Sequence, residues 1–165
     1  MTGQFQQDLD AIIVPLSEGL LAGEAMLVTA ESCTGGWIAK CCTDYAGSSN
    51  WFERGFVTYS DAAKQEMLHV SAKLLEEQGA VAEVVALAMV AGAFRHSPAT
   101  AALAVTGIAG PDGGSRDKPV GTVCFAWGHN GKSHSQTCVF AGDRNSVREK
   151  TVIHALTRML EFVTG

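Results

Sequence analysis

The chain has 165 residues, of which 47% are hydrophobic and 18% are charged, and its formal net charge at pH 7 is −5. This length and composition are typical of a globular domain with a buried core, and they exclude a disordered protein. Domains that bind nucleic acids neutralise phosphates with basic surfaces, so the acidic balance argues against that class. We expect one domain over residues 1–165.

The sequence also indicates a compartment and a chemistry. Its first residues carry neither a basic leader nor an apolar signal segment, and its apolar tracts are too short to span a bilayer. The five cysteines form no CxxC pair, and the five histidines have no zinc-binding spacing. We therefore expect a cytoplasmic protein with no metal, no other cofactor and no membrane partner.

Taken in chain order, the hydrophobic pattern alternates between helical and strand periodicity. Apolar residues at helical spacing predict helices over 6–21, from 37, from 61, and over 71–78, 82–94 and 145–163. Short apolar runs predict strands over 25–30, 53–59, 100–106, 120–127 and 133–140, the last two joined by a turn at 128–131. This order predicts an α/β fold, a three-layer α/β/α sandwich with a mixed, mainly parallel sheet.

The first candidate site follows the first strand, at Thr29-Ala-Glu-Ser-Cys-Thr-Gly-Gly36. A strand that turns directly into a helix presents Ser32 near the helix N-terminus, where free amides stabilise negative charge. Ser32 is therefore a candidate nucleophile. The alternative is that Ser32 or Thr34 only caps the helix. Cys33 is a rival nucleophile, because a thiol at a helix N-terminus can be activated, but it has no recognisable histidine partner.

The second candidate site is Tyr59-Ser-Asp-Ala-Ala-Lys64, where a predicted strand ends and a helix begins with Ser60 or Asp61 as its cap. A lysine in the first helical turn opposes the helix dipole. If Lys64 is desolvated, it can lose its proton and serve as the base for Ser32. The alternative is an exposed surface lysine.

Two further segments suggest a phosphorylated ligand. The glycine-rich loop over 106–121 permits close backbone approach to a phosphate or an oxyanion, although it can also be a plain surface loop. Arg144 and Arg148 lie four residues apart at the start of the last helix, where a phosphate would relieve their mutual repulsion. The alternative is a pair of solvated arginines.

Several motifs, in this order, resemble those of the CinA carboxy-terminal family over residues 7–163. They are Thr29-Ala-Glu-Ser-Cys-Thr-Gly-Gly36, Gly47-Ser-Ser49, Arg54-Gly-Phe-Val-Thr-Tyr-Ser60, Thr106-Gly-Ile-Ala-Gly-Pro-Asp-Gly-Gly114, Lys118-Pro-Val-Gly-Thr-Val123 and Gly142-Asp-Arg144. That family includes stand-alone nicotinamide mononucleotide deamidases of pyridine nucleotide recycling. The resemblance implies a three-layer α/β/α fold, a homo-oligomer, and hydrolysis of nicotinamide mononucleotide to nicotinic acid mononucleotide and ammonia.

The resemblance also implies roles for individual residues. Ser32 would be the nucleophile, Lys64 its base, and Tyr59 would orient Lys64 or relay a proton. The implied substrate-binding set comprises Glu31, Cys33, Thr34, Gly35, Thr106, Gly107, Gly110, Gly114, Lys118, Arg144 and Arg148. The leading alternative is a non-catalytic pyridine-nucleotide-binding or regulatory module, in which Ser32 is only a cap. A DNA-uptake partner protein is a third class, which the acidic charge disfavours.

Overall fold

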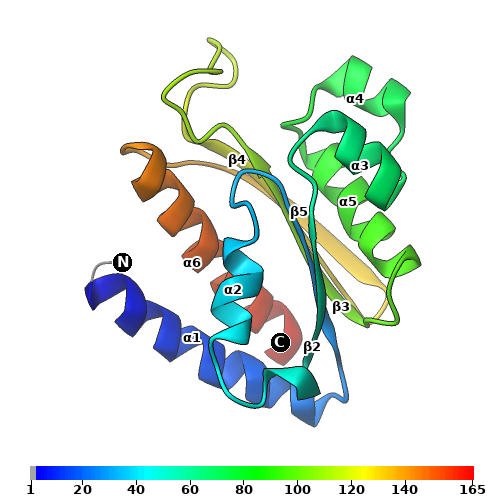
Figure 1. Cartoon of the computed structure of the whole chain (residues 1–165), viewed down its shortest axis with the longest axis vertical. Helices are drawn as coiled ribbons and strands as arrows, with labels where there is room; N and C mark the ends of the chain where they lie inside the picture. The colour runs from blue at the N-terminus through cyan, green and yellow to red at the C-terminus, as the bar shows by residue number, and fades with distance from the viewer. Residues whose placement is uncertain (1–2) are drawn as a thin grey trace.

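The computed structural model describes residues 3–165 and consists of a five-stranded sheet between two layers of helices (Figure 1). The strands are β1 (Leu27–Glu31), β2 (Phe52–Val57), β3 (Ala101–Gly107), β4 (Thr122–His129) and β5 (Lys132–Val139). The helices are α1 (Gly3–Ala22), α2 (Trp37–Thr43), α3 (Asp61–Leu68), α4 (Ala72–Gln78), α5 (Glu83–Arg95) and α6 (Arg144–Thr164), with a 3₁₀ turn at Ser48–Asn50. The predicted order of elements and the three-layer α/β/α class are confirmed.

The strand order is β2-β1-β3-β4-β5. β1 pairs in parallel with both β2 and β3, whereas β4 and β5 form an antiparallel hairpin on the far side of β3. The carboxyl ends of β1, β2 and β3 therefore meet at one edge of the sheet. In open α/β sheets this edge is where ligands bind.

Two boundaries differ from the prediction for local reasons. β2 ends at Val57, not at residue 59. The last backbone hydrogen bond to β1 is donated by Thr58 N to Glu31 O at 2.8 Å, and the chain then turns away from the sheet. Ser60 then caps α3 by accepting from Ala63 N. The hairpin turn is shorter than predicted, since both strands run up to an Asn130-Gly131 turn in which both residues have positive φ.

Each face of the sheet has its own hydrophobic core. β1, β3 and β4 are buried over nearly their whole length, as expected for strands covered on both faces. α1, α2 and α6 pack on one face, and α3, α4 and α5 on the other (Figure 1). Among residues 3–165, no helix combines the length and the apolar character needed to cross a bilayer.

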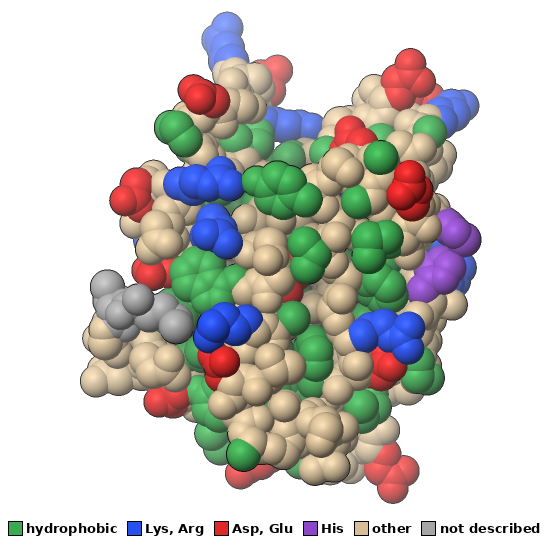
Figure 2. Space-filling model, viewed as in Figure 1, with side chains coloured by type: hydrophobic (Ala, Val, Ile, Leu, Met, Phe, Trp, Pro, Cys, Tyr) green, Lys and Arg blue, Asp and Glu red, His purple; other side chains and the backbone are tan. Residues whose placement is uncertain are grey.

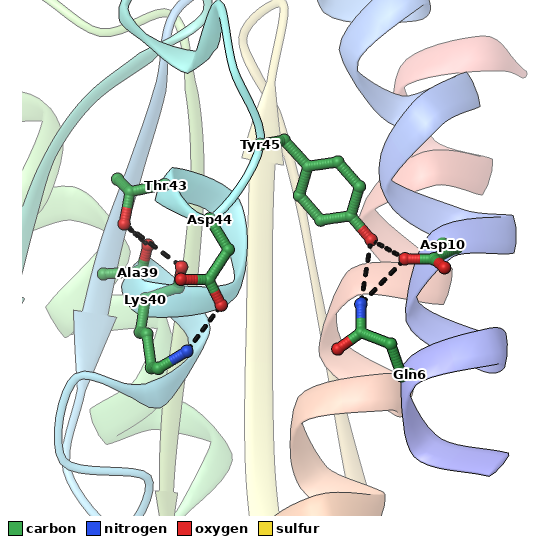
Figure 3. Close-up of polar contacts among 7 residues, drawn as sticks. All are labelled: Gln6, Asp10, Ala39, Lys40, Thr43, Asp44 and Tyr45. Carbon is green, nitrogen blue, oxygen red and sulfur yellow. Dashed lines mark hydrogen bonds and ion pairs between the residues drawn. The ribbon is translucent and has the colours of Figure 1, made fainter. Parts of the chain in front are cut away.

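A polar contact ties α1 to the loop after α2 (Figure 3). The Tyr45 hydroxyl donates to the Asp10 carboxylate and accepts from Gln6 Nε2, and both of these residues lie on α1. On α2 itself, Lys40 forms an ion pair with Asp44. These contacts anchor the C-terminal end of α2, the helix whose N-terminal end follows the predicted nucleophile turn.

Candidate active site

A cavity of about 210 Å³ opens at the carboxyl edge of the sheet. Its walls come from the β1–α2 turn, the start of α3, the segment after α4, the end of β3 and the start of α6. The lining residues are Ser32, Cys33, Tyr59, Asp61, Lys64, Ala80, Val81, Thr106, Gly107, Ala109 and Arg144. In the same view, Figure 2 shows a hollow at this end of the molecule between two projections, which are the glycine-rich loop and α4.

Ser32 and Lys64 meet inside this cavity. The Lys64 Nζ donates to the Ser32 Oγ at 3.2 Å, although the two residues are 32 positions apart in the sequence. The Ser32 N–H donates to Val105 O at 3.0 Å, which holds the turn against β3. A hydroxyl within hydrogen-bond reach of a basic group is the arrangement that nucleophilic catalysis requires.

Lys64 is buried, with only 1% of its side chain exposed, so it is not the exposed surface lysine that the sequence left open. Its Nζ has a second acceptor, Thr58 O at 3.1 Å, and the Asp61 Oδ1 lies 4.0 Å away. Burial lowers the pKa of Lys64 below the ordinary lysine value, and the charges of Asp61 and Cys33 offset this only in part. The neutral amine that a base requires is therefore favoured relative to a lysine in water.

The Glu31 carboxylate binds the backbone N–H groups at the N-terminus of α2, and this contact contradicts two predictions from the sequence. Its carboxylate, 1% exposed, accepts from the backbone N–H groups of Gly36, Ile38 and Ala39 at 2.8–3.1 Å, and from the Thr34 hydroxyl at 2.7 Å. The prediction that Ser32 or Thr34 caps the helix is thus wrong. The expectation of free first-turn amides beside Ser32 is wrong too, because Glu31 already occupies them.

In this arrangement, the small residues of the turn have structural roles. Thr34 is fully buried and donates to Glu31, so it does not line the cavity. Gly35 and Gly36 both have positive φ, +61° and +92°, which lets the chain turn sharply enough to lay α2 over the Glu31 carboxylate. Of the predicted binding residues in this turn, only Cys33 faces the cavity beside Ser32.

Cys33 is a poor candidate nucleophile. Its side chain is buried, and that burial raises the pKa of its thiol to about 12, so the reactive thiolate is scarce at neutral pH. For the amide hydrolysis that the family resemblance implies, we therefore expect Cys33→Ala to change kcat by less than about threefold, measured alongside Ser32→Ala as the inactive reference. Loss of activity on the scale of Ser32→Ala would instead assign the attack to sulfur.

Tyr59 and Arg144 form one unit at the mouth of the cavity. Arg144 donates from Nη2 to the Tyr59 hydroxyl at 3.0 Å and from Nη1 to Gly110 O at 2.7 Å. Within residues 3–165 the Tyr59 hydroxyl has no hydrogen bond to Lys64, and Thr58 O supplies the contact that orients the amine. The predicted contact by which Tyr59 would orient Lys64 is therefore absent among these residues.

Arg148 departs from its predicted place beside a phosphate. Its guanidinium donates to Cys33 O at 3.1 Å and Thr34 O at 2.9 Å, and it lies 5.0 Å from the centre of the Trp37 ring. Arg148 therefore braces the turn that carries Ser32, while Arg144, one helical turn earlier, lines the cavity. The two arginines do not converge on one site, because Arg144 binds a carbonyl of the glycine-rich loop, whereas Arg148 binds carbonyls of the Ser32 turn.

The glycine-rich loop contributes to the site mainly through its first residues. Thr106 and Gly107 line the cavity, and the Thr106 hydroxyl donates to Ala80 O at 2.8 Å, which fixes the opposite wall. A Cβ at Gly107 would lie 2.9 Å from Thr122 O, so glycine is required for the chain to pass. Gly110 takes part through the carbonyl that Arg144 binds.

Two predicted binding residues of the loop lie outside the cavity wall. Gly114 packs within the loop, since a Cβ there would lie 2.7 Å from Val120 N. Lys118 donates from Nζ to Gln78 O at 2.9 Å, which links the loop to the end of α4 across the hollow. Both residues shape the loop rather than line the cavity.

The sequence interpretation missed some of the lining residues. Asp61 was considered only as a helix cap, Ala109 only as part of the glycine-rich loop, and Ala80 and Val81 were not considered at all. Alanine and valine carry no chemical signal, so only the fold reveals them. Asp61 could have been found, because an acid three residues before a buried lysine lies on the same helical face.

In the described part of the chain, no group of three or more His, Cys, Asp or Glu side chains is arranged to hold a metal ion.

Comparison with known proteins identifies the family of this chain. The family model of the CinA C-terminal domain matches residues 10–163. The nicotinamide-nucleotide amidohydrolase PncC of Escherichia coli K12 is 49% identical, covering 89% of this chain and 92% of the relative. The protein of the same name from Pseudomonas putida is 51% identical, covering 90% and 93%.

Solved structures show the same fold. The crystal structure of the competence damage-inducible protein A from Klebsiella pneumoniae has a TM-score of 0.91 and 36% identity, covering 94% of this chain and 97% of that one. The competence/damage inducible protein CihA from Agrobacterium tumefaciens has a TM-score of 0.89 and 41% identity, covering 100% and 98%. The family match, the identities and the fold agree, and the chain belongs to the CinA C-terminal domain family.

Proposed function

We propose that this chain is a nicotinamide mononucleotide amidohydrolase, which hydrolyses the carboxamide of that nucleotide to nicotinic acid mononucleotide and ammonia. The observation that carries the proposal is the hydrogen bond between the buried Lys64 Nζ and the Ser32 Oγ inside the cavity. The names of its relatives, nicotinamide-nucleotide amidohydrolases, supply the substrate and the bond. A single amidohydrolase domain over residues 1–165 is part of the same proposal.

The first half of the reaction forms an acyl-enzyme. Neutral Lys64 accepts the Ser32 hydroxyl proton while Oγ attacks the carboxamide carbon, and the carbonyl oxygen becomes an oxyanion. When the tetrahedral intermediate collapses, Lys64 returns the proton to the nitrogen, which leaves as ammonia. Thr58 O holds the amine toward Ser32 throughout. In the second half, Lys64 takes a proton from water as the water oxygen attacks the acyl carbon. The bond from that carbon to Ser32 Oγ then breaks, Lys64 returns the proton to Oγ, and the product acid is freed.

The oxyanion needs a donor other than the first-turn amides of α2. The Cys33 N–H is suited to this role, because it directly follows the nucleophile and donates to no backbone carbonyl within residues 3–165. In α/β-hydrolases the N–H in this position forms part of the oxyanion hole. One such donor contributes about 2.7–4 kcal/mol to the transition state in a well-measured case. Arg148 donates to Cys33 O, the carbonyl of the following peptide, and so supports the same turn.

Arg144 is the proposed phosphate-binding residue. We expect Arg144→Gln to lower kcat/KM for nicotinamide mononucleotide about tenfold or more, because a charge-assisted hydrogen bond to phosphate is worth about 1.5–3 kcal/mol. The value for nicotinamide riboside, which lacks the phosphate, should fall much less. The matched control is Arg116→Gln, at an exposed arginine of the glycine-rich loop that does not line the cavity. Equal losses for both substrates would remove phosphate binding from Arg144.

The test of the function is ammonia release from nicotinamide mononucleotide by the purified chain, with and without EDTA. Release that is unaffected by EDTA supports the metal-free amidohydrolase. Binding of the nucleotide with no ammonia formed would instead make the protein a nucleotide-binding or regulatory module. The nucleotide should be assayed beside free nicotinamide, which has the same amide without the ribose phosphate.

We also infer that the protein works in the cytoplasm as a homo-oligomer, with no nucleic-acid or membrane partner. Support for the absence of a nucleic-acid partner comes from the net charge of −5. The oligomer rests on the family resemblance alone, and its measurement is light scattering of the purified chain.

A further inference from the structure

Asp61 lines the catalytic cavity and has no part in the mechanism above. It is the first residue of α3, and 56% of its side chain is exposed. Of the cavity-lining residues, Asp61 alone carries a carboxylate, whereas Lys64 and Arg144 carry the basic groups. An acid in the first helical turn is favourable against the dipole, but that preference would be met equally by a side chain turned away from the cavity.

The carboxylate of Asp61 lacks a strong partner. Within residues 3–165 it accepts no hydrogen bond, and the nearest cation is Lys64 Nζ, at 4.0 Å. Lys64 must be neutral to act as the base, so in the reactive state this ion pair is lost. Arg144 is engaged with the Tyr59 hydroxyl and Gly110 O. Once Lys64 is neutral, the Asp61 carboxylate therefore has no ion-pair partner among the described residues.

The proposed substrate supplies the missing positive charge. In nicotinamide mononucleotide the pyridine nitrogen is bonded to ribose, so the ring is a cation, and the carboxamide is attached directly to that ring. For the carboxamide carbon to reach Ser32 Oγ, which lies 3.2 Å from Lys64 Nζ, the ring must enter the region next to that amine. Asp61 lies on the same side of the cavity as the amine, 4.0 Å from it.

The exposed ring of Tyr59 supports the same ligand. Its side chain is 61% exposed and lines the mouth of the cavity, and Tyr59 precedes Asp61 by two residues. An aromatic face attracts a flat cation, and a carboxylate nearby adds charge complementarity. We propose that Asp61 is a specificity-determining residue that recognises the cationic ring, so that the site prefers pyridinium ligands to otherwise similar ligands with a neutral ring. This inference rests on the proposed function.

The test compares two ligands that differ in ring charge. Reduced nicotinamide mononucleotide keeps the carboxamide, ribose and phosphate, but its dihydropyridine ring is neutral. Dissociation constants for both nucleotides are measured by calorimetry in a Ser32→Ala background, which prevents turnover, with and without Asp61→Asn. We expect Asp61→Asn to weaken binding of the oxidised nucleotide about two- to fivefold, the upper part of the range for a partly exposed charge pair, and to leave binding of the reduced one unchanged.

The matched control is Glu66→Gln, which removes the same charge from an exposed position of α3 that does not line the cavity. An unchanged ratio of the two dissociation constants in Asp61→Asn, or the same change in Glu66→Gln, would overturn the inference. Since Asp61 is exposed and makes no hydrogen bond through its side chain, the variant should unfold at the same urea concentration as its parent. Ammonia release by the wild type is measured separately, so failure of the proposed function and failure of this inference are distinguishable.

Discussion

Replacing Lys64 with methionine is expected to lower kcat for ammonia release by at least about a thousandfold, while the dissociation constant for nicotinamide mononucleotide changes by less than about threefold. A positioned general base contributes about 10²–10⁴ in rate, and a nucleophile that depends on it loses still more when the two act as a unit. The methionine is unbranched and apolar, so it fills the buried space without leaving an unpaired charge. Steady-state kinetics and calorimetry separate the two quantities.

Three variants make this result specific. Lys64→Arg should be as inactive as Lys64→Met, because a guanidinium keeps its proton at any accessible pH. The double variant Ser32→Ala/Lys64→Met should lose no more activity than either single variant, as for residues that act together. Lys73→Met, at an exposed lysine of α4, should match the wild type. A kcat for Lys64→Met within tenfold of the wild type would exclude Lys64 as the base.

The same mechanism fixes the direction of the pH dependence. Activity requires neutral Lys64, so kcat/KM should rise with pH through the pKa of Lys64 and level off above it. Because burial lowers that pKa, the midpoint of the rise should lie at a lower pH than the ordinary lysine pKa of 10.5. Methionine at position 64 should abolish the rise together with the activity.

The largest expected effect on stability is at Glu31. We expect Glu31→Ala to lower the free energy of unfolding by about 3 kcal/mol or more, measured by urea denaturation. The substitution strips the N–H groups of Gly36, Ile38 and Ala39 of their shared acceptor inside the protein. Each buried donor left unpaired costs about 1–3 kcal/mol, and relaxation of the turn recovers only part of the sum.

The matched control is Glu18→Ala, which removes an exposed carboxylate from α1 and should change stability by less than about 0.5 kcal/mol. Glu31→Gln should fall between the two, because its amide oxygen still accepts while its NH₂ group faces the helix donors. A loss below 1 kcal/mol in Glu31→Ala would mean that water replaces the carboxylate, and the turn carrying Ser32 would then need another support.

Local sequence patterns predicted the elements, their order and the region of the site. Helical and strand periodicities are local properties, and they predicted the α/β/α layers within two or three residues at most boundaries. The error at the end of β2 reflects one backbone hydrogen bond, which leaves no trace in composition, and the error at the hairpin reflects a tight turn of two residues with positive φ. The motifs around Ser32, Lys64 and Thr106 pointed to the correct edge of the sheet, because parallel strands bring their carboxyl ends together.

The role of each polar side chain at the site, in contrast, could be assigned only from the folded structure. Ser32 and Lys64 come within 3.2 Å through the parallel pairing of β1 and β2, a contact that no local pattern encodes. Arg144 and Arg148 look equivalent in sequence, yet one lines the cavity and the other binds carbonyls of the Ser32 turn. Glu31 likewise turned out to be the helix cap. Burial and the choice of hydrogen-bond partner depend on which distant segments pack together, and that is a property of the folded chain.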